Sequence, residues 1–261
     1  MRELTLGISP CPNDVYIFSG ILLGNVPTEG VRFRTDFQDV ETLNRRAQAE
    51  EMDVVKVSYA NVPRCAAQYD RLESGGALGR GVGPLLLAHG DRWDPDAEVL
   101  VPGEFTTANF LLDFYARRPL QKRFLPFDAL YDRLCRTPGA QGVVIHEKRF
   151  TYARDGLTLI QDLGAAWEER TGLPIPLGAI LARKSLGLAA DMDRWVRASL
   201  AWADAHYPDA FALCRDHASD LTDGVIESHI GLYVNDYSRD LGEEGRAAVE
   251  FFLAAQARNS E

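Results

Sequence analysis

A histidine stands at the end of a short apolar run near the middle of this 261-residue chain. Residues 143–145 are apolar, His146 follows, and the next three residues are charged. The run predicts a buried strand that reaches solvent at the histidine. Ligands of open α/β sheets bind outside the carboxyl ends of strands, and imidazole titrates close to neutral pH. His146 is therefore a candidate base that takes a proton from a substrate, with a solvated strand-end histidine as the alternative.

Two polar residues follow the first predicted strand, at residues 1–8. Asn13 and Asp14 lie in a proline-rich turn before an apolar, helix-like segment at 15–23. Either residue can cap that helix, and the free N–H groups at the helix start would attract an anion. A cap without a ligand is the alternative interpretation, because caps are common.

A cation and a hydroxyl lie near the end of another predicted strand, at residues 54–58. Lys56 and Ser58 are alternate residues and therefore point to the same side of a strand. Together they are suited to hold a carboxylate or a polar ring edge. A surface lysine is the alternative, although Val55 and Val57 make the run unusually apolar for an exposed strand.

A pair of threonines precedes a later predicted helix, at residues 110–115. Thr106 and Thr107 follow a predicted strand and a glycine turn at 98–103. Hydroxyls and free N–H groups at a helix start would face the same crevice as the other strand-end residues.

The charge of the chain limits its partners. The net charge is −10, and no basic run offsets it, which argues against binding to nucleic acid or to an anionic membrane surface. The first residues lack the apolar core of a signal peptide, and no apolar stretch has the length of a membrane span. We therefore expect a cytoplasmic protein that binds a small molecule and does not insert into a membrane.

Neither the cysteines nor the glycines form a cofactor motif. The four cysteines are far apart without C-x-x-C spacing, so no metal site or disulfide framework is predicted. The glycine-rich segment at 74–84 precedes a strand and matches neither the phosphate-loop nor the dinucleotide pattern. Its glycines instead predict positive φ and close backbone approach at a domain crossing or a cleft wall. We expect no metal and no cofactor.

The order of predicted elements indicates two α/β lobes. Strands alternate with helices up to about residue 90, and a second unit with its own strands occupies residues 91–175. Residues 157–172 are interpreted as a connector, and an apolar strand at 173–182 returns the chain to the first unit before a mainly helical end. The predicted larger domain is 1–90 with 176–261. This is the layout of a type II periplasmic-binding-protein-like fold with its ligand cleft between the lobes.

Several long motifs carry a resemblance that covers nearly the whole chain. It resembles the 1,4-dihydroxy-6-naphthoate synthase family of menaquinone biosynthesis in the segments 9–14 (SPCPND), 56–59 (KVSY), 75–84 (GGALGRGVGP), 101–103 (VPG), 106–108 (TTA), 145–147 (IHE), 149–152 (RFTY) and 167–174 (WEERTGLP). The chain departs from the family pattern at Val15, where a hydroxyl residue is common, and at Asn109, where an aromatic residue is expected.

The resemblance implies a lyase of the futalosine route. Its members cleave cyclic dehypoxanthine futalosine to release 1,4-dihydroxy-6-naphthoate, without a metal or organic cofactor. The resemblance assigns the catalytic base to His146. It assigns substrate contacts to the segment Lys56, Val57 and Ser58 and to the pair Thr107 and Ala108.

Two alternatives share the expected fold. Chorismate dehydratase of the same pathway is one, and a non-catalytic solute-binding protein is the other. The strand-end histidine and the missing export signal favour an enzyme over a solute-binding protein, and turnover of each substrate distinguishes all three.

Overall fold

The structure is a computed structural model that describes residues 2–258 and contains two separate sheets. The first sheet has the order β2-β1-β3-β11-β4, and β5 also pairs with β11. Its strands are β1 (Arg2–Ile8), β2 (Val31–Phe37), β3 (Val54–Ser58), β4 (Tyr69–Arg71), β5 (Ala77–Gly79) and β11 (Ile175–Arg183). The second sheet has the order β10-β6-β9-β7-β8. Its strands are β6 (Leu85–Ala88), β7 (Val99–Val101), β8 (Lys122–Phe124), β9 (Gln141–Val144) and β10 (Thr158–Asp162).

Both sheets are mixed, with the parallel strands on one side and the antiparallel strands on the other. β1 is parallel to β2 and β3, and β7 is parallel to β8 and β9. β11 runs antiparallel to β3, while β6 runs antiparallel to β9 and β10. The ends of β3 and β9 therefore place Ser58 and His146 where the two sheets face one cleft.

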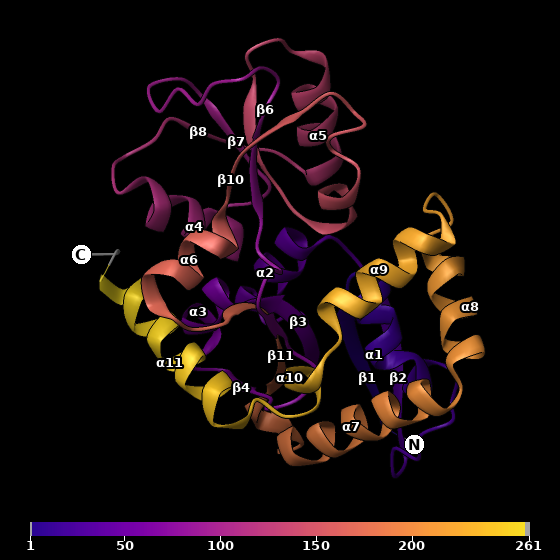
Figure 1. Cartoon of the computed structure of the whole chain (residues 1–261). Coiled ribbons are helices and arrows are strands. Elements are labelled where there is room, and N and C mark those ends of the chain that lie inside the picture. The colour runs from indigo at the N-terminus through magenta and orange to yellow at the C-terminus, as the bar shows by residue number, and fades with distance from the viewer. Residues whose placement is uncertain (1, 259–261) are drawn as a thin grey trace.

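Helices surround each sheet. On the first sheet, α1 (Pro12–Leu22) packs against α7 (Ala189–Ala205), α8 (Tyr207–His217) and α9 (Asp223–Tyr233). Figure 1 shows the second sheet and α5 in the upper part of the molecule, above β1, β2, α1 and α7. The remaining helices are α2 (Val40–Gln48), α3 (Val62–Cys65), α4 (Thr107–Ala116), α5 (Phe127–Arg136), α6 (Leu163–Thr171), α10 (Asp236–Arg239) and α11 (Gly242–Arg258). We call each sheet with its covering helices a lobe.

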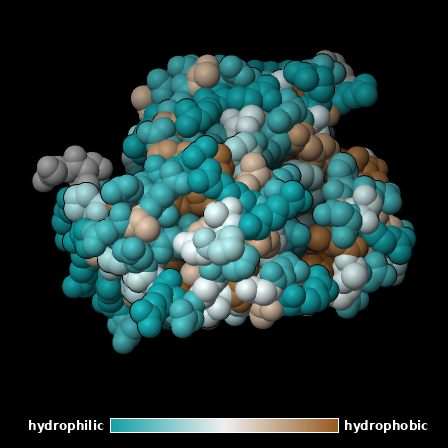
Figure 2. Space-filling model, turned by 90° about the horizontal axis from the view of Figure 1, so that it is seen from above, coloured by the Kyte–Doolittle hydropathy of each residue, from teal (hydrophilic) through white to brown (hydrophobic). Residues whose placement is uncertain are grey.

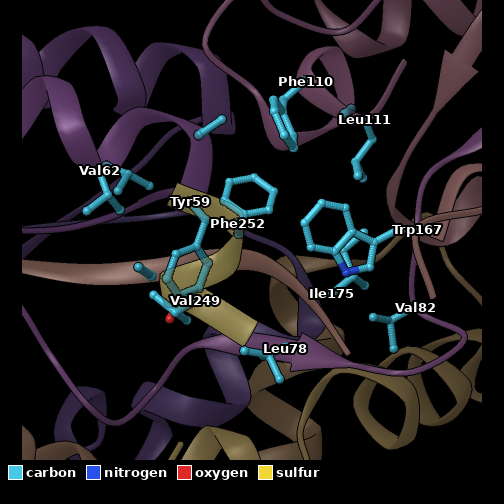
Figure 3. Packing of buried hydrophobic residues seen from close by; sticks show 14 of the residues in the cluster. Tyr59, Val62, Leu78, Val82, Phe110, Leu111, Trp167, Ile175, Val249 and Phe252 are labelled. Atoms are coloured by element: carbon cyan, nitrogen blue, oxygen red, sulfur yellow. The ribbon is translucent and has the colours of Figure 1, made fainter. Parts of the chain in front are cut away.

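An aromatic cluster joins the lobes on one side. Phe110 of α4 and Trp167 of α6 pack against Phe252 of α11, with ring centroids 4.6 Å and 5.5 Å apart, respectively. Tyr59, at the end of β3, lies 6.4 Å from the same phenyl ring. Figure 3 shows these rings meeting between elements of both lobes. Burial of such large side chains stabilises the contact between the lobes.

The predicted two-lobed α/β fold is confirmed, and the structure differs from the prediction in two details. β6 belongs to the second sheet although it precedes residue 91, so we propose that the inserted lobe spans 85–174 rather than 91–175. The expected connector at 157–172 is strand β10 followed by α6. β10 is an edge strand with exposed and half-buried residues, and its sequence therefore lacks the apolar run of a buried strand.

The surface is mainly hydrophilic in the view of Figure 2, where hydrophobic residues form small separate patches. Within residues 2–258, none of the helices combines the length and apolar character needed to cross a bilayer.

Candidate active site

A cleft lies between the lobes. Residues from both sheets and from the helix starts line it. They are Ser9, Asn13, Asp14, Val40, Leu43, Lys56, Val57, Ser58, Ala77, Val82, Gly83, Pro84, Thr106, Thr107, Ala108, Val144, Ile145, His146, Arg149, Leu177, Gly178, His229 and Tyr233. This set includes every site residue predicted from the sequence.

The glycine-rich segment forms part of the cleft wall. A Cβ atom on Gly83 would lie 2.3 Å from the backbone of Gly164, at the start of α6. Only glycine allows these two backbone segments to approach so closely. The close backbone approach predicted for this segment is therefore present.

A buried ion pair lies at the bottom of the site. The Lys56 ammonium is 2.8 Å from Asp14 Oδ1, and the two residues are only 5% and 4% exposed. Lys56 Nζ also donates to the Gly75 carbonyl, and the Ser9 hydroxyl donates to Asp14 Oδ2. Burial raises the pKa of Asp14, but Lys56 and Ser9 outweigh it and hold that pKa below its usual range. The charge of Lys56 is thus already balanced within the protein.

The predicted helix cap was wrong. Cys11 is the N-cap of α1, without a side-chain cap bond, and Pro12 opens the helix. Asn13 and Asp14 lie inside the first turn, where Asn13 donates its amide to Asp14 at 3.0 Å. Proline has no N–H group, so this helix start has one fewer donor to satisfy, and Asp14 is available to Lys56.

His146 lies two residues after the end of β9 and has an unusual backbone conformation. Its φ of 59° is left-handed, and it starts a 3₁₀ turn over His146–Phe150. Among the described residues that line the cleft, it is the only non-glycine residue with positive φ. That conformation costs about 1–2 kcal/mol for an L-residue, and such strain concentrates at functional sites.

Two side chains hold the imidazole of His146 in place. Nδ1 lies 3.3 Å from Sγ of Cys11, which comes from the other lobe. The Phe127 ring meets the imidazole edge to face at 5.2 Å. If Nδ1 carries the proton and donates to sulfur, Nε2 is left to accept a proton from a ligand.

The surroundings of His146 change its pKa. Burial lowers the pKa, but Cys11, Glu147 and Asp14 together raise it from 6.5 to about 9. The protonated form therefore dominates at neutral pH, whereas the sequence led us to expect a mostly neutral base. The fraction able to accept a proton grows as pH rises toward that value.

The two predicted hydroxyls differ in their hydrogen bonds. Ser58 Oγ accepts from the Asn44 amide at 3.1 Å, so its own hydrogen can still be donated into the cleft. Thr107 Oγ1 instead donates to the carbonyl of Leu177 at 2.9 Å. Ser58 therefore keeps a free donor for a ligand, and Thr107 links the two lobes.

Sequence reasoning did not select Cys11, Arg149, His229 or Tyr233 as site residues. Arg149 donates to the carbonyl of Gly83 and lies 3.3 Å from Asp162. His229 and Tyr233 lie one turn apart on α9, in a predicted helix that carries no chemical motif. Their only sequence signal is two polar rings four residues apart on the buried side of that helix.

The two positions that depart from the family pattern do not line the cleft. Val15 is fully buried in the core of the first lobe. The Asn109 amide donates to the Glu104 carbonyl and accepts from Lys122. Over residues 2–258, no group of three or more His, Cys, Asp or Glu side chains is arranged to hold a metal ion.

Comparison with known proteins decides the family. The family described as "Menaquinone biosynthesis" matches residues 4–258. The chain belongs to this menaquinone biosynthesis family. A Thermus thermophilus relative named 1,4-dihydroxy-6-naphthoate synthase is 47% identical, with 99% of this chain and 96% of the relative covered. A Streptomyces coelicolor relative of the same name is 40% identical, with 97% and 93% covered.

Solved structures agree with the fold. An Archaeoglobus fulgidus protein superposes with a TM-score of 0.92 at 28% identity, covering 99% of this chain and 98% of that chain. The periplasmic aliphatic sulphonate binding protein of Escherichia coli has a TM-score of 0.67 at 11% identity, covering 100% and 88%. This member of the menaquinone biosynthesis family therefore has the fold of periplasmic binding proteins.

Proposed function

We propose that this protein is a 1,4-dihydroxy-6-naphthoate synthase, a carbon–carbon lyase that acts on cyclic dehypoxanthine futalosine. Full-length identity to two relatives of that name supports the reaction. The observation that carries the catalytic role is His146, a strained histidine whose Nδ1 is held by Cys11 and whose ring lines the cleft.

His146 is the general base of this proposal. With Nδ1–H donating to the Cys11 sulfur, Nε2 takes a proton from the substrate carbon beside a carbonyl group. The electron pair of the broken C–H bond moves toward the carbonyl oxygen, and an enolate forms. This step starts the ring opening and carbon–carbon cleavage that release the naphthoate.

The enolate needs hydrogen-bond donors in a site that excludes water. The Ser58 hydroxyl has an uncommitted hydrogen in the cleft. Lys56 contributes a third N–H beyond its two bonds to Asp14 and Gly75. These groups come from β3, while His146 comes from the other lobe, so the substrate contacts both walls of the cleft.

The proposed reaction uses only side chains of this chain, without a metal or an organic cofactor. Its substrate is a small molecule that fits between the lobes, as ligands do in binding proteins of this fold. The two alternatives to the proposed function are dehydration of chorismate and ligand binding without turnover.

Turnover tests the proposal. Purified protein, first treated with a chelator and then dialysed, is incubated with cyclic dehypoxanthine futalosine or with chorismate, and products are identified by chromatography and mass spectrometry. We expect 1,4-dihydroxy-6-naphthoate from the first substrate and no product from chorismate. Dehydration of chorismate, binding of either compound without any product, or activity restored only by an added divalent ion would contradict the proposal.

A further inference from the structure

A second histidine lines the same cleft from the opposite lobe. His229 lies on α9, which packs against the 3₁₀ turn that begins with His146. It is 1% exposed, and its ring lies 4.7 Å from that of Tyr233. His229 therefore lines the cleft from the first lobe, beside the turn that carries His146.

Both nitrogens of this imidazole are unused within the protein. Across residues 2–258, neither Nδ1 nor Nε2 of His229 forms a hydrogen bond with another residue. Buried polar groups almost always have partners, because an unsatisfied one loses its hydration without compensation. Because His229 is buried at a cleft wall and has no partner among the described residues, we look for its hydrogen-bond partner in a bound ligand.

Two other cleft donors are partly or fully used within the protein. The Thr107 hydroxyl donates to Leu177, and Lys56 donates to Asp14 and Gly75. The enolate formed in the proposed reaction needs donors at the carbonyl oxygen. Like the Ser58 hydroxyl and the third N–H of Lys56, the N–H of His229 is a donor at the cleft that no described residue uses.

We propose that His229 is a second substrate-contacting residue, a neutral donor whose N–H binds the substrate carbonyl oxygen that becomes the enolate. The assignment of the oxygen rests on the proposed function. The imidazole donates one hydrogen bond and exchanges no proton, so its role differs from that of the base.

The electrostatic surroundings support a neutral ring. Burial and the charge of His146 lower the pKa of His229, Asp14 opposes them, and the result is a pKa of about 3. Tyr233, the ring neighbour, has its pKa raised to about 12 by burial and is also neutral. His229 therefore remains uncharged throughout the pH range in which His146 titrates.

Three substitutions test the proposal by kinetics. His229→Leu removes the donor, whereas His229→Gln and His229→Asn keep an amide N–H at the reach of Nε2 or Nδ1. We expect the leucine variant to lose about 100-fold in kcat, the usual effect of removing one oxyanion donor, and one amide variant to recover at least about tenfold of it. The matched control is His206→Gln, at an exposed histidine stacked on Trp202 outside the cleft, which should retain wild-type kinetics.

The pH profile separates a donor from an acid or base. The acid limb of kcat/KM should have the same apparent pKa in His229→Leu as in the wild type, because His229 does not titrate there. Wild-type kcat in the leucine variant, or loss of the acid limb, would overturn the proposal while leaving the proposed function intact. If the wild type shows no turnover, the Kd for 1,4-dihydroxy-6-naphthoate is measured instead. The proposal for His229 would also be overturned if that Kd is the same in His229→Leu, or if the compound does not bind.

Thermal unfolding excludes a purely structural role. Without protein partners to lose, His229→Leu should have a Tm no lower than the wild type near neutral pH. Below a pH of about 6.5 the unfolded wild type binds a proton that folded His229 does not, so the wild type loses stability as pH falls and the variant should gain relative Tm. A lower Tm at both neutral pH and about pH 5 would show that the ring supports the fold and would contradict the proposal.

Discussion

His146 and His229 line one cleft, yet their environments are opposite. His146 follows a strand of the second lobe and has Cys11 at 3.3 Å, with carboxylates nearby that favour its charged form. His229 lies inside a helix of the first lobe, fully buried and without a hydrogen bond to any described residue. The pKa of the first is raised to about 9, and that of the second is lowered to about 3.

The difference shows that residue type alone does not define a catalytic role. In the proposed tautomer Nδ1 of His146 donates to the Cys11 sulfur, which leaves Nε2 as the basic nitrogen. Burial without a partner gives His229 a ring that donates or accepts a hydrogen bond but does not take up a proton at physiological pH. In our proposal one cleft combines a proton acceptor, His146, with a neutral donor, His229, and enolate formation needs both kinds of group.

We expect the largest effect from replacing His146, the proposed general base. His146→Asn keeps a polar side chain of similar reach but cannot accept a proton, so kcat should fall by at least about two orders of magnitude while substrate binding stays close to wild type. Steady-state kinetics together with calorimetric titration of product measure both quantities. Near-normal kcat with weakened affinity would reduce His146 to a ligand contact and make Glu147 the next candidate for the base.

Substitutions of the two cleft hydroxyls, Ser58 and Thr107, should have smaller effects that differ from each other. Ser58→Ala removes a free donor and should weaken ligand binding by about 1 kcal/mol. The sequence predicted the same for Thr107, but its hydroxyl donates to Leu177, so Thr107→Val should instead lower the free energy of unfolding by about 1 kcal/mol. Ser228→Ala, at an exposed serine on α9, is the control. Equal losses of affinity in the Ser58 and Thr107 variants would contradict this distinction.

The sequence predicts the site where its residues follow apolar runs. His146 and Ser58 lie at strand ends and Lys56 lies two residues before the end of β3. Such ends gather at one cleft in this class of fold, so local patterns were sufficient to select these residues. The fold itself followed from the alternation of strands and helices. The short strands β4 and β5 were not predicted, nor was β10, whose exposed edge residues lack a strand pattern.

Partners distant in the sequence could not be predicted. Cys11 contacts His146 across 135 positions, and Asp14 pairs with Lys56 across 42. Only the folded chain reveals that Asp14 balances the charge of Lys56 and that the pKa of His146 is raised. His229 was not predicted as a site residue, because no sequence pattern distinguishes a ligand-binding histidine on a helix from a histidine of the core.

The pH dependence of kcat/KM tests the central claim, that His146 is the base and Cys11 sets its proton affinity. We expect a single acid limb in the wild type with an apparent pKa near 9, well above the usual 6.5, because protonated His146 is inactive. Cys11→Ala should move the limb to lower pH, and Cys135→Ala, at a cysteine outside the cleft, should leave it in place. A wild-type limb at or below about 6.5, or one that Cys11→Ala does not move, would contradict the account.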